Sequence, residues 1–130
     1  MRRLGSAFVE RFDSVRSVED TRGLEARAHA GESLVFFPEG TFQSQPGLLP
    51  FRLGAFVVAA RSGTPVVPVT LIGTRTLLRG EALRPHYSAL QMQIGAPLSA
   101  AGSDWQAALQ LRDSARRRIL AQLREADAAA

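Results

Sequence analysis

The chain has 130 residues and a mass of 14.1 kDa, with 45% hydrophobic and 22% charged residues, the balance of a folded globular domain rather than a disordered or fibrous chain. It contains no cysteine and only two histidines, which excludes disulfides, thiolate metal sites and cysteine nucleophiles and leads us to expect no metal. The net charge is +4 and all 16 basic residues are arginines, but only Arg116–Arg118 forms a run, which we interpret as a solvated helix face rather than a nucleic-acid site.

The first third of the chain is predicted to form a strand, a helix and a second strand. A short apolar run at 7–9 is a plausible strand. A helix is expected from Ser17, with Asp20 three residues on as in a capping box, to about residue 30, where Gly31 ends it. Four consecutive apolar residues at 34–37 predict a strand that is buried on both faces.

The middle of the chain is predicted to contain a helix and a strand that follow a polar loop at 43–47. Residues 53–62 are almost wholly apolar and form a buried helix that Gly63 closes. The β-branched run at 66–72 predicts a strand, and its internal Pro68 points to a sheet edge or a bulge.

The last third is predicted to contain a half-buried strand and a long helix. Apolar residues alternate with glutamine over 90–94, which favours a strand with one buried face. Ser103 with Gln106 resembles a capping box, and apolar residues then recur at helical spacing from Trp105 to Leu123. The tail at 126–130 is expected to fray.

Alternating strands and helices predict an α/β fold with a mixed, mainly parallel sheet and helices on both faces, incomplete at its amino-terminal side. We expect one domain over 1–125, truncated at its amino end. No stretch reaches the roughly 20 apolar residues that cross a bilayer, so we expect no transmembrane segment.

Two charged residues directly follow the first two predicted strands. If these strands are parallel, Arg11 and Glu39 lie on the same rim of the sheet, where open α/β sheets bind ligands. The arginine fork suits a phosphate and the carboxylate suits hydroxyls, which together describe a pocket for a small phosphate ester. The alternative is a simple salt bridge between the two residues, and spacing alone does not separate these interpretations.

Three short motifs resemble those of the glycerophosphate and lysophosphatidate acyltransferase family. Residues 5–11 place Gly5, Phe8 and Arg11 as in its second motif, Phe37 to Thr41 reads Phe-Pro-Glu-Gly-Thr as in the third, and 66–69 resembles the fourth. A Phe-Arg-Leu-Gly string at 51–54 also matches the pattern that follows the third motif. The resemblance covers about residues 4 to 98.

The resemblance implies a glycerolphosphate acyltransferase-like fold and acyl transfer from acyl-CoA or acyl carrier protein to a hydroxyl of a glycerophosphate or lysophospholipid. No bound cofactor is implied, and the expected location is peripheral, on the cytoplasmic face of a membrane. Carried over by position, Arg11 would bind the phosphate, and Glu39, Gly40 and Thr41 would hold the glycerol. The residues that could support this site are Phe8, Arg52, Pro68 and Arg75.

The chain departs from the family pattern in two places. The family's first motif has a histidine with an aspartate five positions later, but His29 is followed at that distance by Leu34 and His86 by Gln91. We therefore expect no catalytic residue in this chain, and interpret both histidines as exposed residues at a helix end and in a loop. Phe42 also stands where the family often has an arginine, a change for which Arg52 or Arg75 could compensate.

Two hypotheses follow. The first is the carboxyl-terminal part of a phospholipid-synthesising acyltransferase that is inactive alone and needs a missing amino-terminal segment or a partner chain. The alternative is a non-catalytic module that keeps the phosphate-ester pocket or binds a partner. A nucleic-acid partner is not expected.

Overall fold

The computed structural model describes residues 14–41, 47–77 and 86–123, with side chains described from residue 21 onwards. The elements, in chain order, are α1 (Ser14–His29), α2 (Gly54–Ser62), β1 (Val69–Ile72), α3 (Thr74–Leu77), β2 (Gln91–Ile94) and α4 (Trp105–Leu123). The predicted strand at 7–9 and the tail at 126–130 lie outside the described residues. The expectation of a single domain over 1–125 stays a prediction.

Helix α1 confirms the first predicted helix, although it begins at Ser14 rather than at Ser17. Ser17 therefore lies inside the helix and is not its cap. The carboxyl end is where the sequence predicts it: the Gly31 N–H donates to the Ala28 carbonyl at 3.0 Å, and Gly31 has a φ of 82°. Because this left-handed conformation is strained for other residues, glycine is the natural residue to end the helix.

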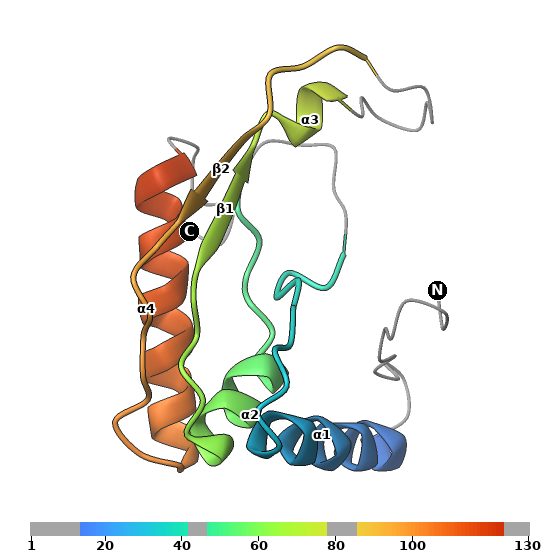
Figure 1. Cartoon of the computed structure of the whole chain (residues 1–130), viewed down its shortest axis with the longest axis vertical. Helices are drawn as coiled ribbons and strands as arrows, with labels where there is room; N and C mark the ends of the chain where they lie inside the picture. The colour runs from blue at the N-terminus through green and yellow to red at the C-terminus, as the bar shows by residue number, and fades with distance from the viewer. Residues whose placement is uncertain (1–13, 42–46, 78–85, 124–130) are drawn as a thin grey trace.

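Helix α2 lies between α1 and α4, and it is almost wholly apolar because it packs on both sides (Figure 1). Its Val58 joins Leu24 and Ala28 of α1 in a small buried cluster. The larger core lies on its other side. Its buried members are Leu48, Phe51, Phe56, Ala59, Ala60, Ala108, Leu111 and Ala115. Several of these residues are alanines, which allow the backbones of α2 and α4 to approach closely.

Helix α4 confirms the last predicted helix, with a different cap. Asp104, not Ser103, caps the helix: its Oδ1 accepts a hydrogen bond from the Ala107 N–H at 2.7 Å. An aspartate satisfies this free N–H and adds a favourable charge at the positive end of the helix. Trp105 lies at the first position and is 64% exposed, so the buried stripe begins at Ala107 and not at Trp105.

The sheet of the described residues is an antiparallel pair of β1 and β2, with Val69 opposite Ile94 and Ile72 opposite Gln91. An isolated bridge joins Val66 to Leu98, and Pro68 lies between this bridge and β1, which confirms that the proline interrupts the strand. The mainly parallel sheet stays a prediction, because no parallel pair occurs among the described residues.

The two faces of this sheet differ. Helix α4 covers one face (Figure 1), where Thr70 is 1% exposed and its hydroxyl donates to Gln122 Oε1. The other face is exposed and apolar. Its members are Val69, Leu71, Met92 and Ile94. Within residues 14–41, 47–77 and 86–123, helices therefore do not cover both faces, and the half-buried strand predicted at 90–94 is wrong because all of β2 is exposed.

The buried strand predicted at 34–37 is wrong as well. The segment is extended but pairs with no strand of the described residues, and Val35 and Phe37 are 83% and 79% exposed. Leu34 alone packs inward, against the small cluster of α1 and α2. Apolar composition shows that a segment suits burial, but a strand also needs a neighbour with which to form hydrogen bonds.

Candidate functional site

The candidate site is built on a tight turn that follows this extended segment. The Gly40 N–H donates to the Phe37 carbonyl at 3.0 Å, and Gly40 has a φ of 67°, a left-handed conformation. Pro38 fits the turn because it has no N–H to satisfy. Glu39 and Gly40 are half-buried and Thr41 is exposed, so the turn presents the motif at the surface of the protein.

The turn is attached to the segment 47–52 by two hydrogen bonds. Glu39 Oε2 accepts from the Leu49 N–H at 2.9 Å, and the Pro38 carbonyl accepts from the Arg52 N–H at 2.8 Å. Glu39 Oε1 accepts no hydrogen bond from residues 14–41, 47–77 or 86–123. One carboxylate oxygen is thus fixed by the Leu49 N–H, and the other has no hydrogen-bond partner among the described residues.

Arg52 lies directly against the motif glycine. A Cβ added at Gly40 would approach Arg52 Nε to 2.5 Å and its Cδ to 2.7 Å, so only a residue without a side chain lets Arg52 pack there. The Arg52 side chain is exposed, and within the described residues its guanidinium makes no ion pair or hydrogen bond. It is therefore a cation placed beside Gly40, with no partner for its guanidinium among the described residues.

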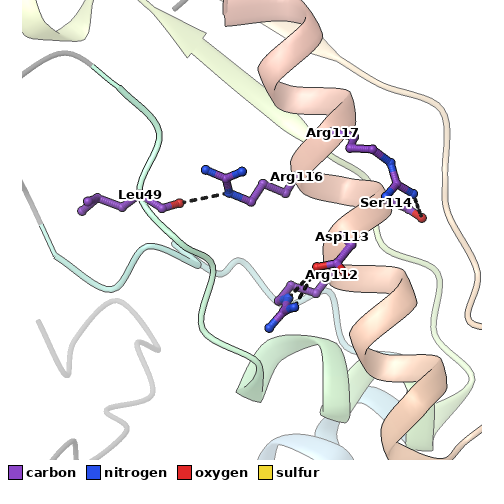
Figure 2. Close-up of polar contacts among 6 residues, drawn as sticks. All are labelled: Leu49, Arg112, Asp113, Ser114, Arg116 and Arg117. Carbon is purple, nitrogen blue, oxygen red and sulfur yellow. Dashed lines mark hydrogen bonds and ion pairs between the residues drawn. The ribbon is translucent and has the colours of Figure 1, made fainter. Parts of the chain in front are cut away.

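Two further arginines hold the carbonyl groups of the segment 47–49. Arg75, in α3, donates to the Gly47 carbonyl at 3.2 Å. Arg116, in α4, donates to the Leu48 carbonyl at 2.7 Å and to the Leu49 carbonyl at 3.3 Å, the latter contact being drawn in Figure 2. Arginine suits this task because its fork can donate to two oxygens at once.

The structure thus brings together some of the predicted site residues. Glu39, Gly40 and Arg52 are neighbours, and Arg75 contacts the segment 47–52 at the Gly47 carbonyl. Pro68 is buried and its carbonyl accepts from the Gly95 N–H, so it belongs to the β1–β2 hairpin. Arg11 and Phe8 lie outside the described residues, and the pairing of Arg11 with Glu39 stays a prediction.

Sequence reasoning missed Arg116. The run Arg116–Arg118 was expected to be a solvated helix face, which is correct for the exposed Arg117 and Arg118 but wrong for the half-buried Arg116. The available signal was its helical spacing, since Arg116 follows the buried Ala115 and lies one turn after the half-buried Arg112. A position at the border of a buried stripe predicts an inward-reaching arginine better than the run itself does.

Neither histidine belongs to this site. His29 is the exposed last residue of α1, and His86 is exposed in the loop before β2, which confirms their expected positions. In the part of the chain that the structure describes, no three His, Asp or Glu side chains are grouped to hold a metal ion, and no helix has the length and apolar character needed to cross a membrane.

The comparisons with known proteins agree with the motifs. The Acyltransferase family model matches residues 1–72, which is more than half of the chain and contains the whole turn at 37–41. The chain belongs to the glycerophosphate and lysophosphatidate acyltransferase family. It is 38% identical over 78 residues to the chloroplastic 1-acyl-sn-glycerol-3-phosphate acyltransferase BAT2 of Brassica napus, and 35% identical over 71 residues to the corresponding enzyme of Haemophilus influenzae.

The family fold is shared as well. The structure matches the crystal structure of the 1-acyl-sn-glycerophosphate (LPA) acyltransferase PlsC from Thermotoga maritima with a TM-score of 0.76 and 23% identity, over 93% of this chain and 47% of PlsC. The matched regions cover 60% of this chain and 23% of the Brassica enzyme, and 54% and 30% for the Haemophilus enzyme. This member of the acyltransferase family therefore spans less than half the length of the relatives it matches.

The acyltransferase motif glycine gives a direct test of the turn. Gly40→Ala should destabilise the protein by about 1–2 kcal/mol through the left-handed backbone, and the new Cβ should displace the flexible end of the exposed Arg52 side chain. Gly31→Ala is the matched control, since Gly31 also has a positive φ but nothing within 4 Å of its Cβ position. Urea unfolding measures both losses, which should be similar because both glycines have a positive φ. Wild-type stability in Gly40→Ala would contradict the left-handed turn.

Proposed function

We propose that this chain forms the acceptor-binding part of an acyltransferase that acylates lysophosphatidate or a similar glycerophosphate hydroxyl. The family relationship supports the reaction class, and the two relatives described above are named as 1-acyl-sn-glycerol-3-phosphate acyltransferases. The observation that carries the proposal is the position of Glu39. One of its carboxylate oxygens is held by the Leu49 N–H, the other accepts no hydrogen bond from the described residues, and the exposed Arg52 packs against the next residue, Gly40.

This arrangement suits a glycerol phosphate in both of its parts. Glu39 Oε1 can accept a hydrogen bond from a glycerol hydroxyl, and a charge-assisted bond of this kind is stronger than a neutral one. The guanidinium of Arg52 can donate two hydrogen bonds to phosphate oxygens. We assign Arg11 to the same phosphate and Gly40 and Thr41 to the glycerol, as the family resemblance implies. Two arginines would balance a phosphate dianion that one alone would leave partly uncompensated.

The chemistry of the reaction requires a base that we do not find in this sequence. The acceptor hydroxyl attacks the thioester carbonyl of acyl-CoA or acyl carrier protein, an ester C–O bond forms, the C–S bond breaks, and the hydroxyl proton passes through a base to the leaving thiolate. Neither His29 nor His86 has an aspartate five residues later. We therefore propose that this chain binds the acceptor but does not catalyse transfer alone.

The absence of that pair also supports a second candidate function, a non-catalytic module that binds phosphate esters. The two candidates share the proposed acceptor site. In the first, another segment or a partner chain supplies the base, and in the second no base is needed. In either case we propose a peripheral location at a membrane surface, because a lysophospholipid acceptor resides there. The proposed acyl donor is acyl-CoA or acyl carrier protein, as the family resemblance implies.

The test is a titration of the purified chain with glycerol 3-phosphate, followed by the NMR shifts of the amides of Gly40, Leu49 and Arg52. We expect these amides to shift together, and glycerol, which lacks the phosphate, to have little effect at the same concentrations. Unchanged shifts up to millimolar glycerol 3-phosphate would contradict acceptor binding at this site.

A second assay tests the proposal that the chain does not catalyse acyl transfer alone. The chain is incubated with lysophosphatidate and acyl-CoA, and the formation of phosphatidate is measured. We expect no turnover above the rate without protein. Turnover would show that the base is present in these 130 residues and would contradict the proposal that the chain is inactive alone.

A further inference from the structure

One peptide group links helix α4 to Glu39. The carbonyl of Leu48 accepts a hydrogen bond from Arg116 at 2.7 Å, and the N–H of Leu49, which belongs to the same peptide group, donates to Glu39 Oε2 at 2.9 Å. In a trans peptide the C=O and N–H point in opposite directions. Arg116 and Glu39 therefore lie at opposite edges of one peptide group.

The charges on the two sides favour this orientation of the peptide. Its oxygen carries the negative end of the peptide dipole and faces the guanidinium, and its N–H carries the positive end and faces the carboxylate. Hydrogen bonds in such a chain polarise one another, so each is stronger when the other is present. The half-buried positions of Arg116 and Glu39 limit the screening of these charges by water.

Arg116 is also well placed to stay fixed. It follows Ala115, which is 2% exposed in the core shared by α2 and α4, and Leu48 belongs to the same core. Its guanidinium makes a second contact, to the Leu49 carbonyl, as Figure 2 shows. The neighbouring Arg117 is exposed and bonds only within its own helix, to Ser114, at 3.1 Å among the described contacts.

We propose that Arg116 is a positioning residue for the acceptor site: it orients the Leu48–Leu49 peptide, and through it Glu39, so that Oε1 faces the acceptor. This inference rests on the proposed function for its ligand, whereas the positioning itself is a property of the protein alone. Arg116 is not expected to touch the acceptor.

The experiment compares Arg116→Met with Arg116→Lys and with Arg117→Met, in the full chain. Arg117→Met is the matched control because it removes the same charge from the adjacent position. Amide hydrogen exchange at Leu49 reports the bond to Glu39, and the amides of Val66 and Leu98, which pair with each other, report global opening. The Kd for glycerol 3-phosphate is measured on the same samples.

In Arg116→Met we expect exchange at Leu49 to accelerate about tenfold or more, as for the loss of a hydrogen bond to a charged group, with Val66 and Leu98 changed less than about twofold. The Kd for glycerol 3-phosphate should rise about tenfold. Arg116→Lys should fall between this variant and the wild type because an ammonium can donate to the Leu48 carbonyl but lacks the fork. Arg117→Met should match the wild type.

Unchanged exchange at Leu49, or equal acceleration at all three amides, would overturn the positioning role, since the second result would show only a general loss of stability. Selective acceleration at Leu49 with an unchanged Kd would show that the peptide does not orient the acceptor site, which also overturns the proposal. A wild-type chain that binds no glycerol 3-phosphate would contradict the proposed function, and in that case exchange at Leu49 still decides whether Arg116 positions Glu39.

Discussion

Glu39→Ala should weaken the binding of glycerol 3-phosphate by roughly tenfold to a hundredfold, the effect of losing a hydrogen bond to a charged group. The substitution removes Oε1, the proposed acceptor of the glycerol hydroxyl, and also Oε2, the partner of the Leu49 N–H. A half-buried N–H without a partner is unfavourable. Besides the loss of acceptor binding, the segment 47–49 should therefore become more mobile.

Glu39→Gln separates these two effects. Its amide oxygen can still accept from the Leu49 N–H, so hydrogen exchange at Leu49 should remain within about twofold of the wild type. Its amide nitrogen replaces the second carboxylate oxygen with a donor, and the charge is lost. We expect binding to fall nearly as far as in Glu39→Ala, while urea unfolding stays close to that of the wild type.

These results are measured by titration calorimetry and by amide exchange on the same samples. Wild-type affinity in both variants would remove Glu39 from the acceptor site. Wild-type affinity in Glu39→Gln alone would show that the carboxylate serves only to hold Leu49, so that the motif has a purely structural role. The two variants thus distinguish a ligand-binding role from a purely structural one.

The helices were predictable from the sequence because their signals are local. Terminal glycines predicted the ends of α1 and α2, and apolar spacing predicted α4. The left-handed Gly63, with its N–H bonded back to the helix, closes α2 as expected. The errors concern competing residues at helix starts: Asp104 caps α4 although Ser103 fits the same pattern. Two adjacent cap residues cannot be separated by spacing alone.

The strands were less predictable because a strand depends on residues far away in the sequence. The run at 34–37 has the composition of a buried strand, yet Val35 and Phe37 are exposed and unpaired in the described structure. The residues of β2 alternate as in a half-buried strand, yet Met92 and Ile94 are also exposed. Apolar alternation predicts which face of a strand suits burial, and not whether another element covers it.

The site was partly predictable. The motif at 37–41 predicted Glu39 and Gly40 as candidate site residues and the family pattern predicted Arg52, but the roles of their neighbours depend on tertiary contacts. Leu49 donates a hydrogen bond to Glu39 through its backbone N–H, a group that every residue except proline has. Arg116 reaches the same peptide across 68 residues of sequence. No local pattern contains such a contact.

Phe56→Ala should destabilise the fold by about 3–5 kcal/mol, a large share of the 5–15 kcal/mol typical of a small domain. Phe56 is 4% exposed between α2 and α4, and its ring stacks on Phe51 with centroids 6.2 Å apart. Because Phe51 adjoins Arg52, whose N–H holds the Pro38 carbonyl, the cavity should also loosen the turn that carries Glu39. Urea unfolding measures the first effect and exchange at the Arg52 amide the second.

Phe37→Ala is the matched control, because it removes the same side chain from a position that is 79% exposed. Exposed substitutions usually change stability by less than about 0.5 kcal/mol. The pair of variants also decides between the sequence pattern and the structure, since the pattern predicts that Phe37 is buried and the structure exposes it. If Phe37→Ala lowered the free energy of unfolding as much as Phe56→Ala does, the segment 34–37 would be covered in solution. It would then have to pack against a surface that the structure does not place beside it.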